Sequence, residues 1–231
     1  MTELLQNSVY FGVIISILSY EAGLFLKKKC KLAICNPLLI ATAATMIFLI
    51  LSNVPYDSYY EGAKYISYLL TPATVCLAIP LYEQFEMLKN NWKAIVFGIL
   101  SGVLTSLVCV LVMAILFGLG HAEYVTLLPK SITTAIGMGI SEELGGYVTI
   151  SVAIIIITGV LGNMFAEGIC RIFKIEDPVA KGIAIGTSSH AIGTTKAMEM
   201  GEIEGAMSSL SIAVAGLLTV VGASIFAGFW I

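Results

Sequence analysis

Charged residues are scarce in this chain, and that scarcity indicates its class. Only 12% of the 231 residues are Asp, Glu, Lys or Arg, whereas 58% are hydrophobic. A soluble domain is roughly one-quarter charged, so this composition is typical of a membrane protein. With a mean hydropathy of +0.95, the chain has room for about seven or eight membrane spans and no separate soluble domain. The net charge of −3 argues against a nucleic-acid partner.

Histidine and paired cysteine are also scarce. The histidines are His121 and His190, and the five cysteines contain no CxxC pair. This combination argues against a structural zinc site, and cysteines beside apolar runs are typical of small buried residues. Ser189 and His190 form no hydrolase pair, because adjacent residues of a helix face different directions. We therefore expect neither a metal, nor another cofactor, nor an enzyme, while coupling to H⁺ or Na⁺ stays open.

The apolar runs predict an all-α polytopic membrane protein whose single domain covers residues 1–231. Helices are expected at 8–26, 36–51, 64–83, 94–119, 147–170 and 207–231. The first run lacks a basic n-region and a cleavage site, which indicates a retained span rather than a signal peptide.

Charge placement predicts the orientation. Nine of the twelve basic residues cluster at 27–31, 89–93 and 171–181. Seven acidic residues occupy the alternate loops: Asp57, Glu61, Glu123, Glu142, Glu143, Glu202 and Glu204. The positive-inside bias therefore predicts that the basic loops face the cytoplasm and that the N-terminus faces out.

Two polar segments, 125–146 and 181–205, interrupt the apolar pattern. Polar backbone at membrane depth persists only where protein buries it or where it lines a watery cavity. The charges predict that 125–146 enters and leaves on the outside as a re-entrant hairpin. Two short crossings are the alternative, because they would leave the same charges on the same sides of the membrane. If 181–205 crosses, Glu202 and Glu204 lie outside and the C-terminus lies inside.

The layout also predicts a weak inverted repeat. Repeat A, about 36–119, and repeat B, about 147–231, match in hydropathy and in the position of their breaks, not in residue identity. Each repeat holds one discontinuous helix, at 64–83 and at 182–200. Inverted repeats with an interrupted helix in each half indicate the binding site of a secondary transporter.

Both breaks offer candidate substrate contacts, and we expect them to lie close together near the bilayer midplane. Thr71-Pro72 is typical of a half-helix start, whose free amides attract an anion; a simple proline kink is the alternative. Gly186–His190 supplies hydroxyls, an imidazole and a flexible glycine, with an interhelical hydrogen bond as the alternative for His190. The substrate-binding candidates are Thr71, Pro72, Thr74, Gly186, Thr187, Ser188, Ser189, His190, Gly193, Thr194 and Lys196.

The first polar segment offers a second group of candidates, which supplies hydroxyls, one carboxylate and one cation. These residues are Lys130, Ser131, Thr133, Thr134 and Glu142. Lys130 or Lys196 could meet a substrate carboxylate, and snorkelling to the membrane interface is the alternative for each. Gly98-x3-Gly102 permits close approach of helices, which suits internal packing better than the seam of a homodimer.

Three stretches carry a family resemblance. They are 69–84 (LLTPATVCLAIPLYEQ), 130–146 (KSITTAIGMGISEELGG) and 177–210 (DPVAKGIAIGTSSHAIGTTKAMEMGEIEGAMSSL). The chain resembles the LrgB/CidB family over nearly its whole length, and the run G-T-x-S-H-x-I-G-T is specific. One departure is Ala135, where the family pattern leads us to expect proline.

The resemblance implies a multi-pass protein of the plasma membrane, a small LrgA/CidA-like membrane partner and two competing functions. One function is that of an antiholin-like modulator of murein hydrolase export and autolysis. The other is transport of small monocarboxylates of the pyruvate, lactate or glycolate type, with pyruvate as the substrate in bacteria and glycolate or glycerate in the related plant plastid translocator. The paired broken helices favour transport, because a holin-like pore former needs amphipathic, associating helices.

Overall fold

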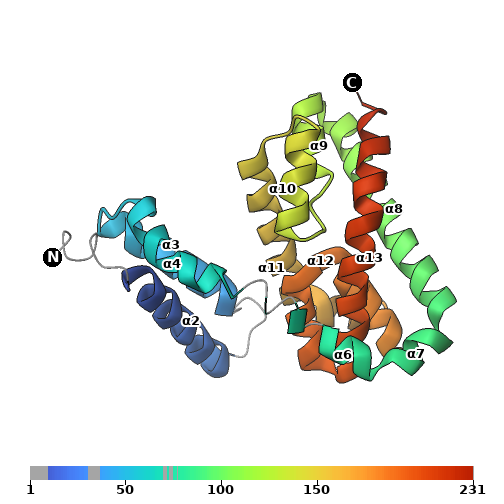
Figure 1. Cartoon of the computed structure of the whole chain (residues 1–231), viewed down its shortest axis with the longest axis horizontal. Coiled ribbons are helices and arrows are strands. Elements are labelled where there is room, and N and C mark those ends of the chain that lie inside the picture. Colours follow the sequence, from blue (N-terminus) through green and yellow to red (C-terminus); the bar gives the residue numbers. More distant parts are fainter. Residues whose placement is uncertain (1–9, 31–36, 70–71, 73–74, 77, 231) are drawn as a thin grey trace. The chain divides into compact units, whose positions relative to one another are not determined.

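The computed structural model describes residues 10–30, 37–69, 72, 75–76 and 78–230, and within these ranges the regular secondary structure is α-helical, without strands (Figure 1). The expected all-α class is therefore confirmed. The chain divides into two compact units, which we call unit 1 (Met1–Cys76) and unit 2 (Leu77–Ile231).

Unit 1 consists of α2 (Phe11–Cys30), α3 (Pro37–Leu51) and α4 (Tyr56–Ser67). Glycine permits the close approach of α2 to α4, because a Cβ on Gly12 would overlap the backbone of Tyr59. Ser16 Oγ also lies 2.8 Å from the Tyr59 hydroxyl. These contacts bind the first and last helices of the unit together.

One expectation for the end of unit 1 is wrong. The acidic residues Asp57 and Glu61 were expected in a loop, but both lie in α4, where Glu61 forms an i,i+3 ion pair with Lys64 that suits a helix. The expected discontinuous helix 64–83 stays a prediction, because α4 ends at Ser67 and α6 begins at Ala78, and part of the range between them lies outside the described residues. Thr71 and Thr74 lie outside the described residues, and Pro72 is exposed.

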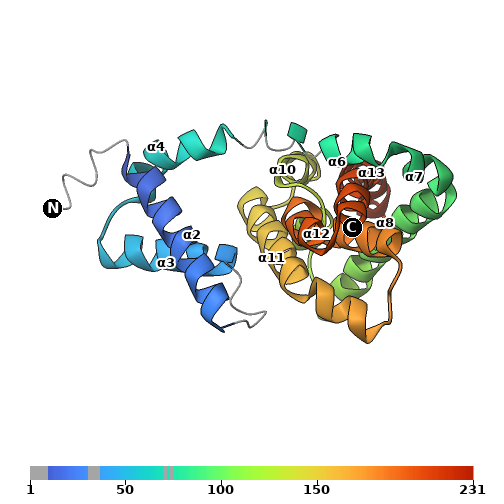
Figure 2. The same cartoon turned by 90° about the horizontal axis from the view of Figure 1, so that it is seen from below.

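Unit 2 contains the remaining helices. They are α6 (Ala78–Glu83), α7 (Phe85–Asn90), α8 (Trp92–Phe117), α9 (His121–Leu127), α10 (Thr134–Glu143), α11 (Val148–Ile172), α12 (Pro178–Met200) and α13 (Glu202–Ala227). In both views α12 lies between α11 and α13 (Figures 1 and 2), and it packs against both of them and against α8.

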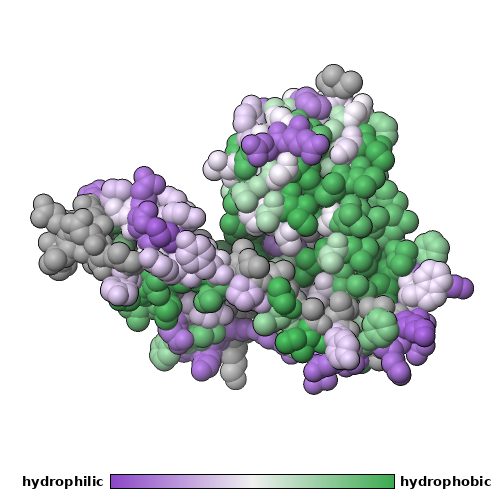
Figure 3. Space-filling model, viewed as in Figure 1, coloured by the Kyte–Doolittle hydropathy of each residue, from purple (hydrophilic) through white to green (hydrophobic). Residues whose placement is uncertain are grey.

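Three helices of unit 2 are long and apolar enough to cross a bilayer: α8, α11 and α13. A hydrophobic band covers the side of unit 2 between two more hydrophilic ends (Figure 3). In unit 1, α3 is apolar but only 15 residues long, and α2 carries Glu21 and lysines in its last turn. The count of seven or eight spans stays a prediction.

Hydrogen bonds between distant residues give the directions of the long helices. Trp230 Nε1 donates to Leu119 O at 2.7 Å, so α8 and α13 finish at the same end of unit 2 and run parallel. Tyr147 N donates to Thr126 Oγ1 at 2.8 Å, which places the start of α11 near α9, and α11 therefore runs antiparallel to α8 and α13. We call the end with Lys93 and Arg171 the basic end, and the other the opposite end.

Residues 121–143, which we call hairpin A, form a helical hairpin that enters from the opposite end. The Tyr147–Thr126 bond brings the chain after α10 back beside α9. The 7 residues of α9 and 10 of α10 extend about 10 and 15 Å at 1.5 Å per residue, too short for a hydrocarbon core of about 30 Å. The geometry agrees with the re-entrant expectation and not with two short crossings.

Residues 178–200, which we call hairpin B, reverse direction at His190. The backbone there has φ 43° and ψ −142°, which interrupts α12. Before this residue the chain runs parallel to α13, because Gly182 lies against Glu204 and Gly186 lies against Ser208. Hairpin B thus enters unit 2 from the basic end.

After His190 the chain runs back along α13. Thr194 Oγ1 lies 2.7 Å from Ser208 Oγ, and Met198 packs against Gly205. Glu202 and Glu204 therefore lie at the basic end, and the C-terminal end of α13 lies at the opposite end. The topology expected from a crossing at 181–205 is wrong, because the segment is two half-length arms rather than one span.

Candidate functional site

The tips of the two hairpins line one cavity of about 810 Å³ beside α8. Hairpin A contributes Lys130 and Ser131, and hairpin B contributes Thr187 and Ser188. The facing side of α8 contributes small and hydroxyl-bearing residues, namely Gly98, Ser101, Gly102, Thr105, Ser106 and Cys109.

The hairpin tips meet α8 near its centre. Thr187 Cγ2 lies so close to Gly102 that a Cβ there would be 2.7 Å away. One turn further along α8, Ser106 Oγ lies 3.3 Å from Ser131 Oγ. Because α8 covers Trp92–Phe117, both contacts fall at mid-depth of a span-length helix. This is the depth at which the sequence predicts the 186–190 break.

One hydroxyl of the cavity lacks a partner. Thr187 is 5% exposed, and its Oγ1 is the one buried side-chain polar atom of the described residues without a hydrogen bond. A buried hydroxyl left without a partner costs about 1–3 kcal/mol. Ser188, by contrast, donates to Ala184 O at 2.7 Å and lies 3.0 Å from Ser189 Oγ. The cavity wall therefore holds one hydroxyl with unused bonding capacity.

His190 faces α11 and does not line the cavity. It is 3% exposed, and its Nε2 lies 3.0 Å from Ile155 O, which can only accept a hydrogen bond, so this nitrogen is the donor. A Cβ on Gly159 would lie 2.7 Å from the imidazole, and one on Gly162 would overlap Ser189. The turn is thus held in a recess of α11, and the interhelical hydrogen bond considered for His190 is formed.

Most other candidates of hairpin B contribute to packing. Thr194 Oγ1 donates to His190 O at 2.9 Å, and Gly193 lies against Ser189 and Ile185. Gly186 is buried against α13. The structure therefore brings Thr187 and Ser188 to the cavity and places Gly186, Gly193 and Thr194 within the helix contacts behind it.

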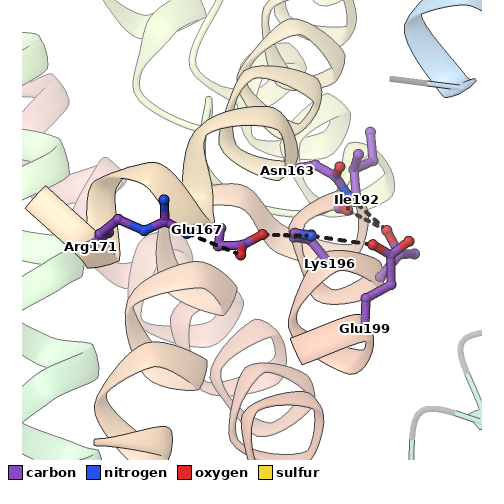
Figure 4. A network of polar contacts seen from close by, with 7 residues as sticks. Asn163, Glu167, Arg171, Ile192, Lys196 and Glu199 are labelled. Carbon is purple, nitrogen blue, oxygen red and sulfur yellow. Dashed lines mark hydrogen bonds and ion pairs between the residues drawn. The ribbon is translucent and has the colours of Figure 1, made fainter. Parts of the chain in front are cut away.

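Lys196 lies in a different environment at the basic end. It forms ion pairs with Glu167 at 3.2 Å and Glu199 at 3.4 Å (Figure 4). These residues line a separate cavity of about 510 Å³ together with Arg171 and Lys181. Above the ion pair, Asn163 Nδ2 donates to Ile192 O at 2.8 Å, so one face of α11 holds the second arm of hairpin B.

Of the second group of candidates, only Lys130 and Ser131 line the central cavity. Thr133 is the residue that precedes α10, Thr134 is its first residue, and Glu142 is exposed in its last turn. The sequence analysis did not identify the contribution of α8. Its signal is the spacing of four in Gly98, Gly102, Ser106 and in Ser101, Thr105, Cys109, which places small and polar residues on one side of an otherwise apolar helix.

The span-length apolar helices, the hydrophobic band and the polar backbone inside it define an integral membrane protein of the all-helical class. The sequence pattern of the LrgB-like family matches residues 16–229. The chain is 38% identical over 221 residues to "Antiholin-like protein LrgB" of Bacillus mycoides (strain KBAB4), and 37% identical to the proteins of the same name in Bacillus cereus (strain B4264) and Bacillus anthracis (strain CDC 684 / NRRL 3495). Each match covers 95% of this chain and 96% of the relative. No solved structure matches the chain. The protein therefore belongs to the LrgB-like family.

Proposed function

We propose that this protein is a secondary transporter of small monocarboxylates, of the pyruvate, lactate or glycolate type, in the plasma membrane. The observation that carries the proposal is the meeting of two helical hairpins, from opposite ends of unit 2, at mid-depth beside one cavity with hydroxyl groups in its lining. Irregular backbone and helix ends at this depth suit a substrate site reached alternately from the two sides.

The order and direction of the helices in unit 2 support this mechanism. α8 is followed by hairpin A from the opposite end, and α11 is followed by hairpin B from the basic end. Helix and hairpin thus occur twice in the same order and in opposite directions. We propose residues 92–143 and 148–200 as the two repeats, in place of the repeats expected at 36–119 and 147–231.

The hairpin tips suit a carboxylate. The second arm of each hairpin, α10 and residues 191–200, begins at its tip, and a helix N-terminus carries about half a positive charge. Ser131, Thr187 and Ser188 add hydroxyl groups near these starts. In this proposal the protein is a carrier and not an enzyme, and H⁺ or Na⁺ is the coupling ion. It works with an LrgA/CidA-like membrane partner. Association into homodimers is a further point to test.

Uptake by proteoliposomes tests the proposal. Purified protein, with and without the LrgA-like partner, should accumulate radiolabelled pyruvate, lactate or glycolate above the level of empty liposomes. Ser188→Ala and His190→Ala should reduce uptake while the protein still inserts. Ser224→Ala is the matched control, because this exposed serine donates only to Val220 O of its own helix. Uptake no greater than that of empty liposomes, with the partner present, would contradict the proposal.

The names of the relatives favour a second candidate, an antiholin-like modulator of murein hydrolase export and autolysis. The two functions predict different effects of cavity variants on uptake and autolysis. If transport is primary, cavity variants lose uptake and alter autolysis together. If modulation is primary, Ser188→Ala leaves autolysis of intact cells unchanged.

A further inference from the structure

Two lysines of unit 2 lie outside the basic clusters, and the structure gives them opposite surroundings. Lys196 is neutralised by Glu167 and Glu199. Lys130 Nζ donates to the neutral Ser131 Oγ at 2.9 Å, and no carboxylate among the described residues lies within 4 Å of it. A cation beneath the surface of a membrane protein is costly unless an anion compensates it. Lys130 therefore lacks a compensating anion among the described residues, whereas Lys196 has two.

The described lining of the cavity contains one cation, Lys130, and one anion, Asp177. These charges lie at different depths. Asp177 is the N-cap of α12 at the basic end, where its carboxylate accepts a hydrogen bond from Ala180 N at 2.8 Å. Lys130 lies at the far end of the cavity, where hairpin A meets the middle of α8. Asp177 thus has its own partner and does not neutralise Lys130.

The cavity is closed toward the opposite end, while exposed residues, such as Ser101, Thr105 and Cys109, also line its side along α8. Near the basic end its lining includes the exposed residues Asn91, Ala94 and Ala180. From Asn91 to Cys109 it follows α8 for 18 residues, or about 27 Å at 1.5 Å per residue. Beyond Cys109, a buried cluster separates the cavity from the opposite end. It consists of Val110, Ala114, Tyr124, Val125 and Leu128.

We infer that Lys130 is the residue that binds the substrate carboxylate, and that this conformation admits the substrate from the basic end. The inference rests on the proposed transport function. The ammonium and Ser131 hydroxyl lie at the closed end of the cavity, and Thr187 Oγ1 offers a hydrogen bond that nothing in the described protein accepts. One carboxylate and one further oxygen of a small substrate would fill both positions.

Transport kinetics compare the two lysines directly. Lys130→Gln should raise the half-saturating substrate concentration at least about tenfold, because it removes a charge-assisted hydrogen bond. Lys130→Arg keeps the charge and should restore most of the affinity. Lys196→Gln is the matched control and should change the half-saturating concentration less than about twofold, since Glu167 and Glu199 hold this lysine outside the cavity.

The outcomes separate this inference from the proposed function. If the wild-type protein takes up no carboxylate, the transport proposal fails. If it does take up a carboxylate and Lys130→Gln has the wild-type half-saturating concentration, the assignment of Lys130 is wrong. A larger effect for Lys196→Gln than for Lys130→Gln would also overturn it.

Cys109 reports on access, because it is a free thiol that lines the cavity near its closed end. In a variant that keeps only this cysteine, a charged methanethiosulfonate reagent should react from the side of the basic end, and saturating pyruvate should slow the reaction. A single cysteine placed at Lys93 identifies that side. Reaction only from the other side, or from neither side, would contradict the inferred access route. Lys130→Gln should weaken the protection by pyruvate, and unchanged protection in that variant would contradict the role of Lys130.

Discussion

Hairpins A and B reach the same depth of unit 2 from opposite ends, but they reverse direction by different means. Hairpin A turns through residues 128–133, a loop with buried Pro129 and its own backbone bonds, such as Ile132 N to Pro129 O at 3.3 Å. Hairpin B turns at His190 alone, a residue with a Cβ and positive φ. A loop can satisfy its turn locally, whereas a one-residue reversal depends on its neighbours.

The neighbours of hairpin B are correspondingly specific. Gly159 and Gly162 leave space for His190 and Ser189, Ile155 O accepts from the imidazole, and Asn163 binds the second arm. Hairpin A is bonded to its neighbours as well: Ser151 Oγ donates to Thr126 O at 2.8 Å, and Tyr124 OH donates to Phe226 O at 2.9 Å. The comparison indicates that hairpin A, which carries Lys130, forms its turn with its own backbone bonds, whereas the turn of hairpin B depends on the packing and hydrogen bond supplied by α11.

A methyl group added behind hairpin B, compared with one added on the exposed side of hairpin A, gives the largest expected difference. Gly162→Ala would overlap Ser189, so we expect a loss of stability of about 1–3 kcal/mol or failure to insert. Gly139→Ala in hairpin A meets nothing within 4 Å and should be neutral or stabilising, by up to about 1 kcal/mol. Thermal unfolding of the two variants in detergent measures the difference. Equal melting temperatures would contradict the tight packing of hairpin B against α11.

Backbone strain at the turn of hairpin B gives an intermediate effect. His190→Ala and His190→Gly both lose the hydrogen bond to Ile155 O, but glycine adopts positive φ without a steric penalty. His190→Gly should therefore be more stable than His190→Ala by about 1–2 kcal/mol. The same unfolding measurement ranks them, and a more stable alanine variant would show that the turn is not strained.

The ion pairs of hairpin B give the smallest effect. Glu167→Gln removes one partner of Lys196 but leaves Glu199, and Glu167 is itself exposed. We expect a loss below about 1 kcal/mol that shrinks further at high salt. A loss of several kcal/mol in unfolding experiments would mean that the pair, rather than the packing around Gly162, holds the second arm.

The sequence predicts the long helices of unit 2 well, because an apolar run of span length has one plausible structure. The expected spans 94–119 and 147–170 differ from α8 and α11 by at most two residues at each end. The direction of 181–205 was not predictable in this way, because two short arms have the same hydropathy as one crossing. Only the tertiary contacts of Gly182 and Thr194 with α13 distinguish them.

The candidate site was predicted in part. The polar motif identifies Thr187 and Ser188, and the second polar segment identifies Lys130 and Ser131. Hydropathy does not reveal that Lys196 is ion-paired elsewhere or that a stripe of α8 completes the cavity, because both facts depend on which helix faces meet.

The return of hairpin B to its own side is the central claim, and side-specific cysteine labelling tests it most directly. In a cysteine-free background, single cysteines replace Lys93, Gly120, Asp177 or Glu202 and react with an impermeant thiol reagent applied to either side of the membrane. The account predicts that positions 93, 177 and 202 react from one side and position 120 from the other. Labelling of position 202 from the side of position 120 would show that 178–200 crosses the membrane and would contradict the account.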